Sequence, residues 1–210
     1  MTIYREATRK EIPYIAKLST EAFGHYPFFD FALQAAFKRQ AAYFAYLERL
    51  HRVHIRANMR RNKCFVGVRD GKIVSAALLQ EPEGKQVSIW DYIRAGGISL
   101  VFPIGFARIL DFFKLSEEAN RDCERLCPAA WYLEMLTVDS GMKGCGLGSA
   151  MLNDCLLPYI RQHRGRELAL ITNTEQNRSF YTKNGFCEVA ERTLTRNAQA
   201  IGNWSFLYKL

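Results

Sequence analysis

Apolar positions recur along the chain with two periods, and their order predicts the order of its secondary-structure elements. Alternating or continuous apolar runs, which are typical of strands, occupy residues 3–8, 64–79, 129–138, 166–173, 186–194 and 204–210. Apolar positions three and four residues apart predict helices over residues 12–22, 31–62, 148–162 and 174–185. The resulting order, β-α-α-β-β-(helical insert)-β-α-β-α-β-β, predicts an α/β fold with an α+β mixed sheet, in a single domain over residues 1–210.

Local signals mark several ends of these elements. Thr8 and Glu11 have the spacing of a capping box and predict the start of the first helix. An Asp-Gly pair at 70–71 separates two apolar runs and predicts a tight hairpin turn. An Asn-Gly pair at 184–185 predicts the end of the last helix.

Residues 84–128 give a less regular pattern. Helical stretches there are interrupted by glycines at 96–97 and by Pro103. We interpret this segment as a helical insertion inside the domain. We expect it to form a wall or lid over a site, as insertions often do.

The composition is that of an ordinary globular protein. The chain has 210 residues, of which 49% are hydrophobic and 24% are charged, and this length can bury a sizeable core. The longest apolar run, residues 98–107, is too short to cross a bilayer, and no secretory leader pattern opens the sequence. We therefore expect a cytoplasmic protein with no membrane association.

Cysteine and histidine spacings do not suggest a metal site. None of the six cysteines lies in a Cys-x-x-Cys pair, and Cys123 and Cys127 are followed by no further ligands at zinc spacing. We expect two buried thiols there and no bound metal. His51 and His54 could share a helical face, but arginines surround them, and we expect that face to be solvated.

The net charge of +8 is concentrated in one part of the chain. Between Lys38 and Lys72, ten Lys or Arg residues exceed two acidic residues by eight. Such a block favours an anionic partner, such as nucleic acid, phosphate or an acidic substrate. A solvated helix face explains it equally well.

A glycine-rich loop follows the strand predicted at 129–138. Gly144, Gly146 and Gly148 stand at alternate positions just before a helix, and Lys143 precedes them. The first N–H groups of a helix lack partners and attract anions, and glycines let a phosphate approach them closely. The loop therefore predicts a cofactor that carries a pyrophosphate.

Two common phosphate motifs fit this loop badly. A Walker A loop has its lysine after the glycines, whereas Lys143 precedes them. A dinucleotide fingerprint has a third glycine where Ser149 stands, and it lies early in a βαβ unit.

A third pattern fits better. The segment 143–148 (KGCGLG) resembles the [Q/R]-x-x-G-x-[G/A] signature of the GNAT N-acetyltransferase superfamily. The segment 177–186 (NRSFYTKNGF) resembles the second cofactor motif of that family, and residues 4–23 are similar to its opening strand and helix. In overall layout the chain is similar to the puromycin acetyltransferase branch, whereas residues 25–125 match only in the order of elements.

The resemblance implies acetyl-CoA, with CoA as its product, as the co-substrate. In this family the pyrophosphate lies on the loop N–H groups and the pantetheine arm pairs with the preceding strand. The implied cofactor-binding residues are Leu136, Thr137, Val138, Lys143, Gly144, Cys145, Gly146, Leu147, Gly148, Ser149, Asn177, Phe180 and Tyr181. Two positions depart from the family pattern. Lys143 replaces the usual Gln or Arg but keeps the charge, and Ile171 stands where many relatives have a glutamate.

Acetyl transfer to an amine needs a proton acceptor, a donor to the carbonyl oxygen and a proton for the leaving thiolate. Tyr181 matches the family tyrosine that protonates the thiolate, and a packing role is its alternative. Glu134 is the candidate base, because burial in an apolar strand would raise its pKa; the alternative is that it faces solvent or an arginine. Tyr132 is the weaker candidate on the same face, and the Val138 N–H is the oxyanion donor by family likeness. Cys145 lies in the phosphate loop, so we expect direct transfer in a ternary complex.

The sequence thus predicts an acetyl-CoA-dependent N-acetyltransferase that acts on an amine of an unidentified small molecule or peptide. The alternative is a non-catalytic acyl-CoA-binding or sensor protein on the same fold, which the loss of an acid at Ile171 favours. No nucleic-acid-binding signature occurs, and we expect no such partner. Monomer and homodimer both remain open.

Residues 25–60 and 84–128 would select the acceptor. Aromatic residues in or beside these segments predict an apolar wall or core, and they are Phe23, Tyr26, Phe28, Phe29, Trp90 and Tyr92.

Overall fold

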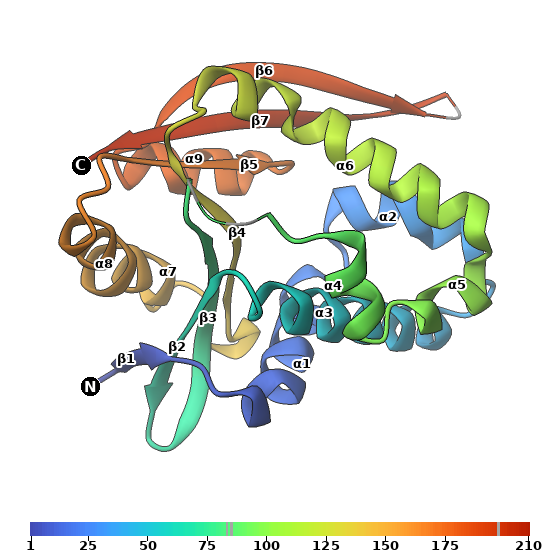
Figure 1. The fold of residues 1–210 in the computed structure, drawn as a ribbon, viewed down its shortest axis with the longest axis horizontal. Coiled ribbons are helices and arrows are strands. Elements are labelled where there is room, and N and C mark those ends of the chain that lie inside the picture. Colours follow the sequence, from blue (N-terminus) through green and yellow to red (C-terminus); the bar gives the residue numbers. More distant parts are fainter. Residues whose placement is uncertain (83, 85, 197) are drawn as a thin grey trace.

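The computed structural model describes residues 1–82, 84, 86–196 and 198–210, so Lys85 of the predicted insertion lies outside the described residues. Seven strands form one sheet in the order β1-β2-β3-β4-β5-β7-β6 (Figure 1). Their bounds are β1 Ile3–Glu6, β2 Lys63–Arg69, β3 Lys72–Gln80, β4 Trp131–Val138, β5 Glu167–Thr172, β6 Cys187–Arg196 and β7 Gln199–Lys209. Neighbouring strands are antiparallel except β4 and β5, which run parallel. The predicted mixed α/β sheet is confirmed.

Helices cover both faces of this sheet (Figure 1). The helices on one face are α1 Ile12–Phe23, α3 Gln40–Asn58 and α6 Phe106–Leu126, and those on the other are α7 Leu147–Ala150, η4 Met151–Leu156, α8 Leu157–Gln162 and α9 Glu175–Lys183. Alternate side chains of β2 divide between the two cores: Cys64 and Val66 face α1, while Phe65 faces α8. This period of two is the pattern that predicted the strands.

Local end signals acted as predicted. The backbone N–H of Thr8 donates to Glu11 at 2.7 Å, completing the capping box before α1. The hairpin between β2 and β3 turns through Asp70 and Gly71, both with positive φ, as a primed two-residue turn requires.

The prediction of one continuous helix over residues 31–62 is wrong. The structure has α2 Pro27–Leu33, a 3₁₀ turn η2 Gln34–Ala36 and then α3, with extended backbone at Phe37 and Arg39. The Phe37 ring lies 5.1 Å from that of Tyr46 and 5.7 Å from that of Tyr43, both in α3. Burial of these aromatic rings favours a turn that folds α2 back over α3, and this tertiary contact outweighs the local helical pattern.

The predicted insertion is helical, as expected. It contains α4 Ile89–Arg94, α5 Ile98–Ile104 and α6, and Figure 1 shows α6 running from α5 back along β6 and β7. Asp91 of α4 is fully buried and pairs with Arg60 at 3.2 Å and Arg61 at 3.1 Å. Part of the basic block is therefore used to attach the insertion to the end of α3. Of the helices in the described part of the chain, none has both the length and the apolar character that a membrane span needs.

Candidate active site

A β-bulge in β4 places Glu134 at a bend of the sheet. Leu78 pairs with Met135 and Leu79 with Leu133, so Glu134 is an extra residue between two register positions. The bulge reverses the alternation of the strand: Leu133 packs in the core that contains α8, and Met135 in the core that contains α1. A strict period of two would have placed these two side chains on the same face.

Beyond the start of β4, the sheet opens. Among the described residues, β4 and β5 pair only through Trp131 with Leu168 and Tyr132 with Ala169. The rest of β4, residues 133–138, therefore has an edge toward β5 whose backbone groups are free to pair with an extended ligand.

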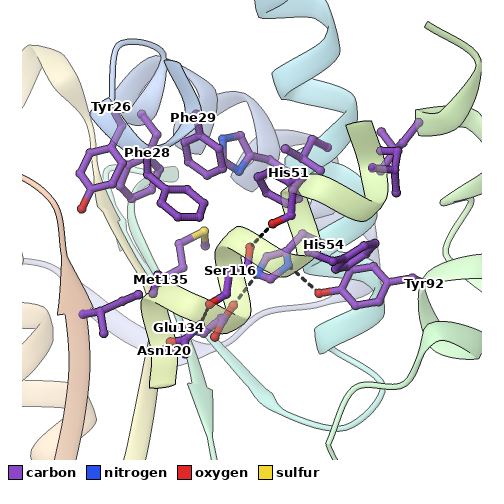
Figure 2. A pocket seen from close by; sticks show the side chains of 18 of the residues that line it. Tyr26, Phe28, Phe29, His51, His54, Tyr92, Ser116, Asn120, Glu134 and Met135 are labelled. Atoms are coloured by element: carbon purple, nitrogen blue, oxygen red, sulfur yellow. Dashed lines mark hydrogen bonds and ion pairs between the residues drawn. The ribbon is translucent and has the colours of Figure 1, made fainter. Parts of the chain in front are cut away.

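A cavity of about 460 Å³ extends from this opening to the helical insertion (Figure 2). Four predicted site residues line it, namely Leu136, Glu134, Asn177 and Tyr181. The insertion contributes residues of α4, α5 and α6 to the opposite wall, so the predicted wall is confirmed. Of the predicted aromatic set, Phe23, Tyr26, Phe28, Phe29 and Tyr92 line the cavity, whereas Trp90 points to solvent.

Glu134 is paired with a histidine inside this cavity. The Oε1 atom of Glu134 lies 3.3 Å from Nε2 of His54, and Nδ1 of His54 lies 3.0 Å from the Tyr92 hydroxyl. The Glu134 side chain is 30% exposed, so the predicted burial of this carboxylate is wrong. The arrangement instead links a carboxylate, an imidazole and a phenol, which can accept and pass on a proton.

The predicted solvated face for His51 and His54 is also wrong. Both histidines line the cavity, and His51 is almost fully buried, with its ring 5.1 Å from that of Phe29. Burial, and then the neighbouring His54, lower the pKa of His51 to about 3. Helical spacing from Leu47 and Leu50 places both histidines on the apolar stripe of α3. This signal could have identified them, but the surrounding arginines hid it.

Tyr132 and Tyr181, two of the tyrosines that line the cavity, have different surroundings. The Tyr132 hydroxyl donates to Oδ1 of Asn120 at 2.5 Å, and its burial raises its pKa well above the usual value. Tyr132 therefore links β4 to α6. Its raised pKa argues against Tyr132 as the base, for which it was the weaker alternative to Glu134. Tyr181 is buried among aromatic rings, and burial raises its pKa also. A phenol of this kind keeps its proton at neutral pH, so it can donate a proton but cannot act as a base.

Tyr26, predicted only as an apolar-wall residue, has a further polar role. Its hydroxyl accepts a hydrogen bond from the backbone N–H of Asn173 at 2.7 Å and lies 3.0 Å from Oγ1 of Thr172. These contacts fix the end of β5 on the far side of the opening from β4. Composition could not reveal this role, because the partners lie 146 and 147 residues away in the sequence.

The predicted phosphate loop lies exposed after β4. Gly144 and Gly146 have φ of +82° and +74°, and nothing lies within 4 Å of where a side chain would begin. The first hydrogen bond of the following helix runs from Ala150 N to Gly146 O, and the Cys145 N–H donates to the Met142 carbonyl at 3.2 Å. The N–H groups of residues 146–149 have no such partner among the described residues and can face an anion. The Phe180 ring would meet a side chain on Gly148 at 3.0 Å, so close packing joins the two predicted motifs.

The remaining predicted positions lie around this loop. Lys143 and Cys145 are exposed, Leu147 is buried and Ser149 is half-buried. Thr137 is buried against α1, where its hydroxyl lies 3.5 Å from the Leu18 carbonyl, and Val138 pairs with Ser75 of β3. An open strand edge, a glycine cradle and free helix N–H groups together fit a ligand with an extended arm and a pyrophosphate.

The sequence matches a family model described as an acetyltransferase (GNAT) domain over residues 60–188. The chain therefore belongs to the GNAT acetyltransferase family, as the loop motifs predicted. No curated protein matches the chain.

Several solved structures share this fold. A histone acetyltransferase and related acetyltransferase from Corynebacterium glutamicum has a TM-score of 0.62 at 19% identity, with 97% of this chain and 94% of that chain covered. A ribosomal-protein-alanine N-acetyltransferase from Brucella melitensis has a TM-score of 0.55 at 15% identity, with 99% of both chains covered. An N-acetyltransferase from Staphylococcus aureus has a TM-score of 0.54 at 12% identity, with 100% and 98% covered. Family membership supports N-acetyltransferase activity in general, for which acetyl-CoA is the usual co-substrate.

Proposed function

We propose that residues 1–210 act as one GNAT domain that transfers an acetyl group from acetyl-CoA directly to an amine in a ternary complex. One observation carries this proposal. A single cavity joins the open edge of β4 to the pair formed by Glu134 and His54. A donor on that edge and an acceptor at that carboxylate would share one cavity, and direct transfer requires the two reactants to be this close.

The donor end of the cavity fits acetyl-CoA through backbone groups. The free N–H groups within residues 143–149 would hold its pyrophosphate, and the backbone of residues 136–138 would pair with its pantetheine arm. Asn177, Phe180 and Tyr181 would complete this side. Bound acetyl-CoA supplies an activated acetyl thioester.

Residues of both ends supply the proton chemistry. Glu134 accepts the proton of the attacking amine, directly or through a water molecule, and His54 holds the carboxylate in place at 3.3 Å. The Val138 N–H is the proposed donor to the carbonyl oxygen. The Tyr181 hydroxyl, which is protonated near neutral pH, is the proposed proton donor to the leaving sulfur.

The surroundings of Ile171 weigh against a non-catalytic sensor. Ile171 lines the cavity as an apolar wall, so the acid that many relatives carry there is absent. Glu134 on the neighbouring strand lines the same cavity and supplies a carboxylate. A sensor would need only the donor end, whereas the carboxylate and imidazole are arranged at the acceptor end.

Thermal unfolding with acetyl-CoA, CoA, NADH or ATP at equal concentration tests the donor assignment. Ligand at about 100 times its Kd stabilises the native state by about 2.7 kcal/mol, so acetyl-CoA and CoA should each raise the midpoint by several degrees. NADH and ATP should have little effect. Absence of a shift with both CoA species would contradict the proposed function, and binding without any release of free thiol across an amine panel would favour the sensor.

A further inference from the structure

The acceptor end of the cavity has an apolar lining that continues to its mouth. Six of its wall residues are Phe28, Phe29, Val101, Ile109, Phe112 and Phe113. At the mouth, Ile89, Ile98 and Phe106 line the cavity although they are 57%, 56% and 63% exposed. Large apolar side chains exposed together are characteristic of binding sites, and these three make an apolar access route.

The charges around the cavity permit one positive charge on its ligand. Among the described residues that line it, Glu134 is the only carboxylate, and none is a lysine or arginine. The lowered pKa of His51 leaves that ring neutral near pH 7. A second ammonium group would lie against apolar walls without a counter-ion, which is costly. An anionic acceptor would meet Glu134 with no opposing cation.

The cavity wall also contains a buried polar atom without a partner among the described residues. His51 is only 3% exposed, and its Nε2 atom has no hydrogen-bond partner among the described residues. Buried polar groups normally have partners, because an unpaired one costs about 1–3 kcal/mol. His51 comes from the same cavity wall as Phe29, opposite Glu134 (Figure 2). An apolar ligand body would lie against this wall without pairing with Nε2, so the inference below rests on the apolar lining and on the single carboxylate.

We propose that the acceptor is a monoamine whose amino group is attached to a large apolar body, either an aromatic ring system or an alkyl chain. The amino group lies at Glu134 and His54, and the apolar body lies between α2 and the insertion. This inference rests on the proposed acetyl transfer and specifies its acceptor. The cavity volume of about 460 Å³ lies within the usual range for small-molecule sites.

Matched amines test the inference. With acetyl-CoA as donor, kcat/KM is measured for octylamine and 3-phenylpropylamine, and for propylamine, spermidine, agmatine and an alanine-initiated peptide. Burying a group of this size contributes about 1.5–3 kcal/mol, so both apolar amines should exceed propylamine by about 10- to 100-fold. A kcat/KM for spermidine, agmatine or the peptide above that of octylamine and 3-phenylpropylamine would overturn the proposal.

A donor comparison separates this inference from a longer acyl chain in the same cavity. Octanoyl-CoA with propylamine is compared with acetyl-CoA and octylamine, so that the same alkyl length enters from opposite sides. Faster turnover with acetyl-CoA and octylamine supports the proposal. Faster turnover with octanoyl-CoA and propylamine would assign the apolar region to the acyl group and overturn it.

Adjacent residues of α6 provide a matched pair of variants. Ile109 lines the cavity, whereas Leu110 is 44% exposed and lies outside its lining. Ile109→Asn should lower the preference for octylamine over propylamine by about tenfold, and Leu110→Asn should retain it. Equal preferences in the two variants would contradict the proposal.

A binding experiment keeps this inference distinct from the proposed function. Octylamine without any CoA should raise the unfolding midpoint of the unmodified protein and of Leu110→Asn, but raise that of Ile109→Asn less. No shift for the unmodified protein would overturn the apolar-amine inference even if acetyl-CoA binds. A shift by octylamine without binding of acetyl-CoA would support the cavity assignment and contradict the transferase.

Discussion

The donor and acceptor ends of the cavity are built in different ways. The donor end comes from one stretch of chain, from β4 through the glycine loop to α9, and offers mainly backbone groups. The acceptor end combines side chains of α2, α3 and the insertion, which are distant in sequence. Backbone recognition needs a particular local conformation, whereas a side-chain cavity needs correct packing of separate helices. A backbone site for the donor can be shared by a family, while a side-chain cavity for the acceptor changes with the acceptor.

The largest expected effect lies where the two ends meet. Glu134→Gln keeps the shape of the side chain but removes its basicity, so kcat/KM should fall by about 10²–10⁴-fold, the usual contribution of general base catalysis. The KM for acetyl-CoA should be retained, because the donor end is held by backbone groups. Steady-state kinetics over a range of pH checks this, and an unmoved pH–rate profile would remove Glu134 as the base.

Tyr181→Phe tests the chemistry at the donor end. Loss of the proton donor should lower kcat by about 10²-fold and leave the KM for the amine unchanged. Because burial raises the pKa of Tyr181, this hydroxyl should add no titration to the pH–rate profile near neutral pH.

Tyr26→Phe is the matched control for Tyr181→Phe. It leaves the Asn173 N–H without its hydroxyl partner and should lower the free energy of unfolding by about 1–3 kcal/mol. Unchanged turnover in Tyr181→Phe would exclude that residue from the mechanism.

Two glycines with similar backbone conformations test how strongly the donor end depends on the loop. Gly146 and Gly71 have φ of +74° and +76°, and both have open space at the side-chain position. Alanine at positive φ costs about 1–2 kcal/mol. Gly146→Ala should raise the KM for acetyl-CoA by about tenfold, since the N–H groups of the glycine loop would shift. Gly71→Ala should lose comparable stability while its KM is unchanged; equal KM values would contradict phosphate binding at this loop.

Asp91→Asn should have the smallest effect on activity, through the acceptor end alone, although loss of this buried partner of two arginines should also lower stability. Asp91 attaches the insertion to α3 through Arg60 and Arg61, so its loss should raise the KM for the amine by about threefold, measured beside an unchanged KM for acetyl-CoA. An equal rise in both KM values would show that the two ends are not independent.

The same aspartate predicts a response to acid. Hydrogen bonds from Ser88, and then Arg61, hold the pKa of Asp91 well below its usual value. A lowered pKa in the folded state means that this contact stabilises fully above the ordinary aspartate pKa of about 4. Its stabilisation is lost as the pH falls below that value. Acid unfolding monitored by hydrogen exchange in α4 should therefore show earlier opening there, and Asp91→Asn should remove this pH dependence.

Features set by neighbouring residues could be predicted. The capping box at Thr8, the hairpin at residues 70–71 and the loop at residues 143–149 each depend on a few adjacent residues and their allowed backbone angles. The break between α2 and α3 and the bulge at Glu134 could not be predicted in this way. Both depend on contacts with distant strands and helices, which override local helical and strand patterns.

The sequence by itself determined the mixed sheet, the glycine loop, the family and the importance of Glu134 as a candidate. Only the tertiary structure decided which groups surround that carboxylate. It placed His54 of α3 beside Glu134 of β4. It also formed one wall of the cavity from the insertion, whose sequence pattern is irregular. The physical reason is that backbone angles and hydrophobic periods are properties of adjacent residues. A cavity exists only when separate elements pack and leave a space between them.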